Sequence, residues 1–184
     1  MITVIKLGGS LLSTSVLPLC LDVIRRFSGR VLIVPGGGVF ADQVRAAQAQ
    51  WGFDDITAHR MAVLAMQQMA LLLKSVQPEF ELFHDVDAVN ALSHPAIWSP
   101  DIAKLDQAGI AASWDVTSDS LAAWLTNIVA AEALFLVKSC QIPAEASFTD
   151  LQQLGILDAG FSHFAHNLSA NITVINKDHF LSLA

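Results

Sequence analysis

The sequence predicts an α/β fold, a three-layer α/β/α sandwich with a mainly parallel open sheet, and three observations predict it. Short apolar runs that are typical of buried strands alternate with amphipathic helical stretches from the first residues onward. The hydrophobic content of 53% allows a large core, and charged residues make up only 15%. The length of 184 residues suits one domain over residues 1–184, and no Pro- or Gly-rich linker divides it.

The chain opens with two strand–loop–helix units. The β-branched run at 2–5 predicts a strand, and apolar residues at helical spacing predict a helix over about 17–27. The apolar run at 31–34 predicts a second strand, and a helix is expected over about 40–50. Strands joined through helices are parallel, and both faces of such a sheet are covered by helices.

A long helix is expected from about 55 to 75, after Asp54 and Asp55, which suit its N-terminus. This helix is apolar on two faces, which predicts burial on both sides and a homo-oligomer that uses this helix as its interface. The other elements expected are strands at 80–83, 96–98, 133–137 and 172–175 and a helix over about 118–129.

The composition excludes several classes of protein. A net charge of −7 with scattered Lys and Arg gives no electrostatic footprint for nucleic acid. The longest apolar stretch, 61–73, contains two glutamines and is too short for a membrane span, so no membrane association is expected. The N-terminus does not resemble a signal peptide, and Cys20 and Cys140 lie far apart, so a cytoplasmic chain with reduced thiols is predicted.

The first candidate site is Lys6 with Gly8, Gly9 and Ser10, directly after the first strand. Glycines let the backbone approach a ligand closely, and consecutive N–H groups in such a turn, helped by a following helix N-terminus, bind anions. Lys6 would direct a positive charge at the same place. The alternative is an ordinary strand-to-helix turn whose lysine reaches solvent.

The second candidate is Gly36, Gly37 and Gly38, which follow the second strand and favour a ligand-facing loop over a plain turn. With Ala41 they also fit a loose dinucleotide-binding pattern, so a Rossmann-type oxidoreductase is an alternative. That alternative requires a further strand directly after the helix at 40–50.

The third candidate lies at the start of the helix near 118. Thr117 or Ser118 is expected to cap this helix, and Asp115 and Asp119 would orient lysines and help to hold the Mg²⁺ of a nucleotide. Lys138 ends the strand at 133–137, and the carboxyl ends of parallel strands are where open α/β sheets bind ligands.

Among the six histidines no zinc pattern is visible. His59, in the long helix, is a candidate for a substrate cleft, although a structural histidine is the alternative. No Walker-type phosphate-binding loop and no nucleophile elbow occurs.

Together these residues resemble the amino-acid kinase superfamily. The run 6–10 is similar to the opening Lys-x-Gly-Gly-Ser of that family, Gly36–Gly38 to its second glycine loop, and Asp119 to the aspartate that organises its catalytic lysines. The segments 55–62 and 113–120 are most similar to a short archaeal and methylotroph branch, which includes the aminomethylfuran phosphate kinase of methanofuran biosynthesis, a part of C1 metabolism.

The resemblance implies an ATP- and Mg²⁺-dependent phosphotransferase that acts on a small phosphate or carboxylate acceptor. Lys6, Gly8 and Gly9 would stabilise the transferred phosphoryl group, with Ser10 beside them. Gly36, Gly37 and Gly38 would hold the acceptor. Asp119 would orient the lysines, and Lys138 would assist at the nucleotide. The later Gly-Gly-Met…Lys element of several relatives is missing after Lys138, so a non-catalytic nucleotide- or metabolite-binding regulatory protein is the alternative.

Overall fold

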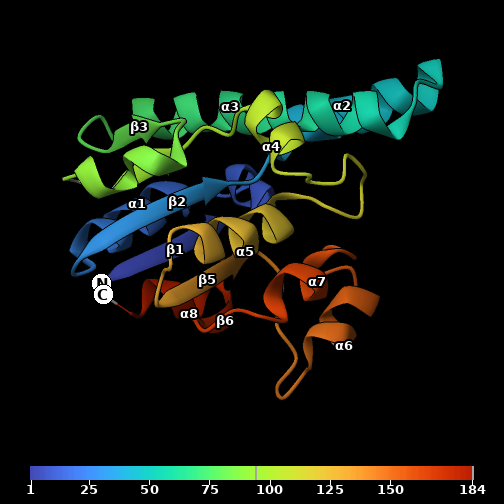
Figure 1. Cartoon of the computed structure of the whole chain (residues 1–184). Coiled ribbons are helices and arrows are strands. Elements are labelled where there is room, and N and C mark those ends of the chain that lie inside the picture. Colours follow the sequence, from blue (N-terminus) through green and yellow to red (C-terminus); the bar gives the residue numbers. More distant parts are fainter. Residues whose placement is uncertain (94, 184) are drawn as a thin grey trace.

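A computed structural model gives the architecture and describes residues 1–93 and 95–183. Its centre is one six-stranded sheet in the order β3-β4-β2-β1-β5-β6, and every adjacent pair of strands is parallel (Figure 1). The strands are β1 (Ile2–Leu7), β2 (Arg30–Pro35), β3 (Glu81–Phe83), β4 (Ala96–Trp98), β5 (Ala133–Lys138) and β6 (Asn171–Asn176). The predicted fold class is therefore confirmed.

Helices surround this sheet. The α-helices are α1 (Leu17–Arg26), α2 (Gly38–Trp51), α3 (Asp55–Val76), α4 (Ile102–Gln107), α5 (Ser118–Ile128), α6 (Phe148–Gln153), α7 (Phe161–Ala165) and α8 (Lys177–Leu181). Two 3₁₀ helices, η1 (Gly9–Ser13) and η2 (Val86–Ala91), complete the described elements. All the strands and long helices expected from the sequence are present, with ends that differ by one or two residues. The short helices α4, α6, α7 and α8 were not predicted because each spans fewer than two turns and shows no clear period.

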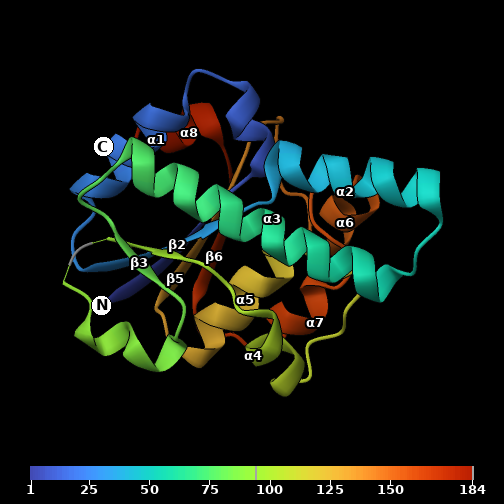
Figure 2. The same ribbon diagram turned by 90° about the horizontal axis from the view of Figure 1, so that it is seen from above.

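Two hydrophobic clusters form the core, one on each face of the sheet. One face is covered by α1 and α8, which lie side by side (Figure 2), and its cluster includes Ile5, Leu21 and Phe180. The other face is covered by α5, and its cluster includes Val4 and Leu121. Helix α3 contributes to both clusters, which explains why two of its faces are apolar in sequence.

The outer surface of α3 keeps exposed leucines. Leu64 and Leu71 are 45% and 60% exposed, two turns apart on the same side of the helix. The two core clusters of the chain thus account for the expected burial of this helix on two sides. The exposed leucines lie on its remaining surface, where the homo-oligomer interface stays a prediction.

The two glycine loops touch at the carboxyl edge of the sheet. A side chain on Gly9 would collide with the nitrogen of Gly38 and lie 2.6 Å from its Cα, and one on Gly36 would lie 2.6 Å from the nitrogen of Gly9. Backbone hydrogen bonds fix this approach, from Gly36 N–H to the Leu7 carbonyl at 2.9 Å and from Gly8 N–H to the Val137 carbonyl at 3.0 Å. Only glycine fits at these two contacts.

The exits from the two loops differ from the sequence prediction. Gly9 enters η1, and α1 begins only at Leu17, so no long helix N-terminus follows the first loop directly. Helix α2 begins at Gly38 rather than Phe40, which brings its N-terminus into the second glycine loop. It is therefore the second loop that combines glycines with free helix N–H groups.

We predict that Gly9→Ala destabilises the fold by about 3 kcal/mol, because a methyl group there must push the two loops apart. Gly109→Ala is the control, since Gly109 has a positive φ of 71° but no neighbour within 4 Å of a new side chain. That variant should lose only about 1 kcal/mol through backbone strain. Urea unfolding measures both, and equal losses would contradict the close contact between the loops.

Candidate active site

Strand alternation places two lysines on one face of the sheet. Side chains of a strand alternate between faces, so Lys6 points to the same side as Val4, and Lys138 to the same side as Leu136. Lys6 is paired with Leu136 in the parallel register of β1 and β5, so Lys138 lies two residues further along the neighbouring strand, at the next position on the same face. Both lysines therefore face α5 at the carboxyl edge of the sheet.

Asp119 lies between these lysines. It is in the first turn of α5, and its Oδ1 is 2.8 Å from Lys6 Nζ while its Oδ2 accepts a hydrogen bond of 2.6 Å from Lys138 Nζ. All three residues are buried, with exposures of 5% for Lys6, 4% for Asp119 and 9% for Lys138. The structure thus brings the predicted catalytic residues together. We call these three residues the charge cluster.

Burial and charge act in opposite directions within the charge cluster. Burial alone would raise the pKa of Asp119, but the charges of Lys6 and Lys138 outweigh it and hold that pKa below its ordinary value. Burial, and then the charge of Lys6, lower the pKa of Lys138 to about 8, although Asp119 opposes this shift. Oδ1 of Asp119 forms an ion pair with Lys6 but has no hydrogen-bond partner among the described residues, so it can still accept a hydrogen bond.

A cavity of about 340 Å³ opens beside the charge cluster. Lys6 and Lys138 contribute to it, and the first glycine loop forms one wall. The remaining lining residues are Ser139, Cys140, Leu154, Gly155 and Ile156. Ser10 and Ser139 join the two sides of this cavity through a hydrogen bond of 2.7 Å between their hydroxyl groups. We call it the lysine cavity.

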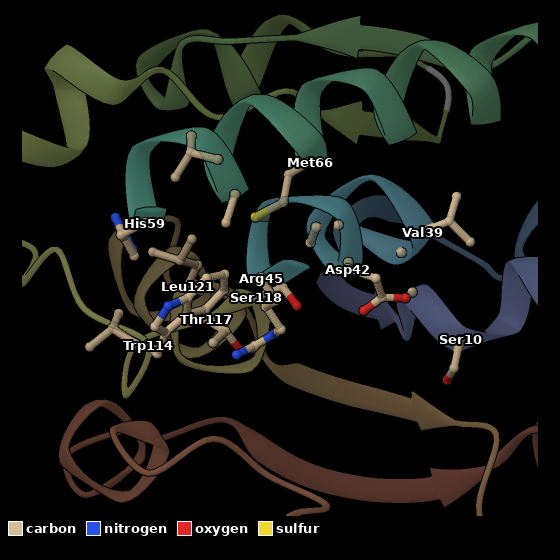
Figure 3. A pocket seen from close by; sticks show the side chains of 18 residues that line it. Ser10, Val39, Asp42, Arg45, His59, Met66, Trp114, Thr117, Ser118 and Leu121 are labelled. Carbon is tan, nitrogen blue, oxygen red and sulfur yellow. The ribbon is translucent and has the colours of Figure 1, made fainter. Parts of the chain in front are cut away.

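A second cavity of about 260 Å³ lies on the other side of the first glycine loop and shares Gly9 and Ser10 with the lysine cavity. The predicted residues Gly36, Gly37 and Gly38 line it. Its other walls come from α2, α3 and the start of α5, and the labelled side chains in Figure 3 surround it. The residues that line it also include Asp42, Arg45, Val63, Met66, Trp114 and Leu121. We call it the glycine-loop cavity.

His59 lines the glycine-loop cavity from α3, as the cleft interpretation of the sequence requires. It is only 5% exposed, and its Nε2 has no hydrogen-bond partner among the described residues. Burial lowers the pKa of His59, so the ring is neutral at physiological pH. A buried, unpartnered ring nitrogen beside a cavity is available to a ligand.

Trp114 holds the loop before α5 against α2, which the sequence did not predict. Its Nε1 donates a hydrogen bond of 2.7 Å to Gln48, and the Arg45 guanidinium lies 3.7 Å above its ring. This cation–π contact fixes a positive charge at the edge of the glycine-loop cavity. No local pattern signals it, because the tryptophan and the glutamine are 66 residues apart.

Two expectations about the start of α5 need correction. Thr117 is the N-cap residue, but its side chain makes no capping hydrogen bond to α5; the hydroxyl instead donates to Asp158, whose carboxylate caps the helix. The Asp115 side chain is exposed and lines neither cavity, so the structure does not bring it to the lysines. Asp115 contributes through its backbone carbonyl, which accepts a hydrogen bond of 2.6 Å from Gly160.

The Rossmann alternative is not supported by the chain path. Residues 52–54 connect α2 directly to α3, where a dinucleotide-binding unit requires a strand. Within residues 1–93 and 95–183, no group of three or more His, Cys, Asp and Glu is arranged to hold a metal ion. None of the helices in the same part of the chain has both the length and the apolar character of a membrane span.

Comparison with known families decides the wider assignment. A family model described as the amino acid kinase family matches residues 1–141, which include both glycine loops and the whole charge cluster. The chain belongs to the amino acid kinase family. The matched region therefore contains the residues on which the resemblance in the sequence depends, from Lys6 to Lys138.

Individual relatives of this amino acid kinase family member are distant in sequence. A curated protein named [5-(aminomethyl)furan-3-yl]methyl phosphate kinase, from Methanocaldococcus jannaschii, is 24% identical over 137 residues, which are 68% of this chain and 60% of that protein. Uridylate kinase from Archaeoglobus fulgidus has the same fold with a TM-score of 0.72 and 15% identity, covering 100% of this chain and 95% of the other.

Aspartate kinase from Synechocystis is similar over 96% of this chain and 38% of its own, with a TM-score of 0.69 and 13% identity. These two solved structures establish the fold.

We predict that one of the five lysines of this family member titrates near pH 8, because burial and Lys6 disfavour the charged form of Lys138. Heteronuclear NMR of the lysine side chains measures the midpoint, and the resonance is assigned by its loss in Lys138→Arg. In Asp119→Asn the midpoint should fall below that of the wild type, since Asp119 stabilises the ammonium form. A Lys138 midpoint above pH 10 would contradict the buried geometry.

Proposed function

We propose that this chain is an ATP-dependent kinase that transfers the γ-phosphoryl group of ATP to the phosphate group of a small acceptor. The observation that carries the proposal is the buried charge cluster, whose two lysines line the lysine cavity, next to the glycine-loop cavity that shares Gly9 and Ser10 with it. Family membership supports a small-molecule phosphotransferase, and the presence of two adjoining cavities supports separate sites for two substrates.

The lysine cavity suits the phosphates of ATP. It presents two ammonium groups and the backbone of the first glycine loop, which are the groups that recognise phosphate oxygens in proteins. Mg²⁺ would be held chiefly by the nucleotide phosphates, as is usual for this ion, and would neutralise their charge. Asp119 Oδ1, which can still accept a hydrogen bond, suits a ligand water of such an ion.

The glycine-loop cavity suits the acceptor. The N-terminus of α2 and Arg45 would bind an anionic group, and the neutral His59 would donate or accept one further hydrogen bond. In the reaction, an acceptor oxygen attacks the γ-phosphorus while the bond to the bridging oxygen of ADP breaks, and ADP leaves with the bonding electrons. Lys6 and the N–H group of Gly9 would stabilise the charge on the equatorial oxygens, while the Gly8 N–H stays bonded to the Val137 carbonyl and shapes the loop.

Asp119 would keep both lysines in place during this transfer. Without its carboxylate the two ammonium groups would repel each other in a buried space, and each would move toward solvent or lose its proton. Phosphoryl transfer depends mainly on positioning and on electrostatic stabilisation, so a displacement of the lysines is costly.

We predict that Lys6→Ala and Asp119→Asn each lower kcat by about 100- to 1000-fold while the fold is kept. ADP release from Mg-ATP measures turnover against a panel of acceptors led by the aminomethylfuran phosphate, and 31P NMR identifies the diphosphate product. Lys104→Ala is the control, because Lys104 also pairs with an aspartate at 2.7 Å but is 43% exposed and lines neither cavity. Full turnover in both site variants would contradict the proposed kinase function of this site.

The acceptor is proposed to be an amine-bearing aromatic phosphate such as the compound in the name of the Methanocaldococcus relative. Val63, Met66 and Leu121 give the cavity an apolar wall for a flat ring. Asp42 places a carboxylate at the same cavity, and it forms no ion pair with any residue that the structure describes. An ammonium group on the acceptor would supply its missing partner.

We predict that Asp42→Asn raises the KM of the aminomethyl-bearing acceptor about tenfold, the effect of losing one charge-assisted hydrogen bond. The KM of the same acceptor with a methyl group in place of the aminomethyl group should stay unchanged. Asp22→Asn, on the exposed side of α1, is the control variant. If both acceptors lose affinity equally in Asp42→Asn, the amine is not what Asp42 binds.

One observation favours a second function. The family match ends at residue 141, and the matched region covers only 60% of the curated relative. A chain that has lost part of the nucleotide site would act as a non-catalytic nucleotide- or metabolite-binding regulatory protein. ATP that protects the fold against heat, without ADP release for any acceptor, would favour this function.

We also propose a homo-oligomer and a cytoplasmic location. A homo-oligomer would cover Leu64 and Leu71 on the outer side of α3, and a cytoplasmic location would supply the ATP that the reaction requires.

A further inference from the structure

Asp158 binds the first turn of the helix that carries Asp119. Its Oδ2 accepts hydrogen bonds from the Thr117 N–H at 2.9 Å, the Thr117 hydroxyl at 2.8 Å and the Ser120 N–H at 3.0 Å. Its Oδ1 accepts a further hydrogen bond from the Ser120 hydroxyl. The carboxylate therefore satisfies two of the backbone donors that a helix N-terminus leaves free, and it brings a negative charge to the positive end of the helix.

These contacts hold the residues on both sides of Asp119. Thr117 lies two positions before it and Ser120 directly after it, so rotation of this turn must break hydrogen bonds to Asp158. The two lysine contacts of Asp119, at 2.6 and 2.8 Å, leave little room for such a rotation. The position of the Asp119 carboxylate thus depends on the carboxylate of Asp158, which is 39 residues further along the sequence.

The segment that carries Asp158 is itself held by hydrogen bonds and close packing. Gln152 donates hydrogen bonds to the carbonyls of Asp158 and Ala159 at 3.0 and 2.6 Å. A side chain on Gly160 would lie 2.7 Å from the Asp115 carbonyl, so the segment touches the loop before α5. Figure 1 shows α7, which follows this segment, packed beside the N-terminal end of α5.

Asp158 does not face either substrate cavity. It lines neither the lysine cavity nor the glycine-loop cavity, and its carboxylate already accepts four hydrogen bonds from Thr117 and Ser120, three at Oδ2 and one at Oδ1. Leu154, Gly155 and Ile156, just before it, do line the lysine cavity. The same short segment therefore forms a wall for the nucleotide and holds the helix that carries Asp119.

We propose that Asp158 is a positioning residue for phosphoryl transfer, acting through the first turn of α5 to fix Asp119 between Lys6 and Lys138. This inference rests on the proposed kinase function. It assigns a catalytic purpose to the part of the chain that lies beyond the family match, which ends at residue 141.

The test compares Asp158→Asn with the wild type. Asparagine has the same shape, but its amide NH₂ faces N–H and O–H donors, so at least one side of the contact is lost. We expect kcat to fall about 100-fold, the effect of a displacement of about 1 Å at the reacting groups. The KM values of ATP and the acceptor should change less than twofold, because neither cavity loses a lining residue. An unchanged kcat would overturn the proposal.

Asp150→Asn is the matched control. Asp150 caps α6 in the same region, where its carboxylate accepts hydrogen bonds from the Ser147 N–H and hydroxyl at 2.9 and 2.6 Å. It therefore loses an equivalent cap without touching α5, and its kcat should equal that of the wild type. A loss as large as that of Asp158→Asn would reduce the effect to general destabilisation and overturn the proposal.

Two further measurements keep the test decisive if Asp158→Asn folds poorly or the wild type proves inactive. Ser120→Ala removes one donor to Asp158 from a residue that lines neither cavity, and kcat should fall about tenfold. Amide hydrogen exchange, followed by mass spectrometry, should rise at residues 117–121 in Asp158→Asn but not in Asp150→Asn. Absence of turnover in the wild type defeats the proposed function alone, whereas unchanged exchange at 117–121 defeats the role of Asp158.

Discussion

Two lysine ammonium groups and one aspartate carboxylate share a buried space at the carboxyl edge of the sheet, and the rest of the site is arranged around that constraint. Transfer of an unpaired charge from water into a protein interior costs several kcal/mol, so neither lysine would stay buried without Asp119. With both lysines protonated, the charge cluster keeps a net charge of +1, two positive charges less one negative. In a chain with a net charge of −7, this local positive charge is what can attract a phosphorylated ligand.

The second constraint is the contact between the glycine loops. Gly9 and Gly36 bring two backbones within a distance that no side chain permits, and at this contact the lysine cavity and the glycine-loop cavity adjoin, with Gly9 and Ser10 lining both. A transfer reaction requires donor and acceptor sites that adjoin, since the reacting atoms must approach within about 3 to 3.5 Å. Larger residues at these positions would separate the two cavities and leave each as an isolated binding site.

Helix α5 links the two constraints. Its first turn supplies Asp119 to the lysines and Ser118 to the glycine-loop cavity, and it is held from outside by Asp158. The loop before it is fastened to α2 through Trp114 and Gln48. The glycine-loop cavity, Asp119 and the C-terminal segment are therefore parts of one connected structure, so residues beyond the family match, which ends at residue 141, also hold this part of the chain in place.

The sequence by itself determined the strands, the long helices and the face on which each lysine lies. Local periodicity carries this information, because a period of two places Lys6 on the same face of the sheet as Val4 and Lys138 on the same face as Leu136. The glycine runs mark the places where two loop backbones approach each other closely. Only the tertiary structure decided that Asp158, not Thr117 or Ser118, caps α5 and that Trp114 binds Gln48, while Asp115 stays exposed. These contacts join residues 38 to 66 positions apart, and such partners leave no periodic trace in a single sequence because their meeting depends on how whole elements pack.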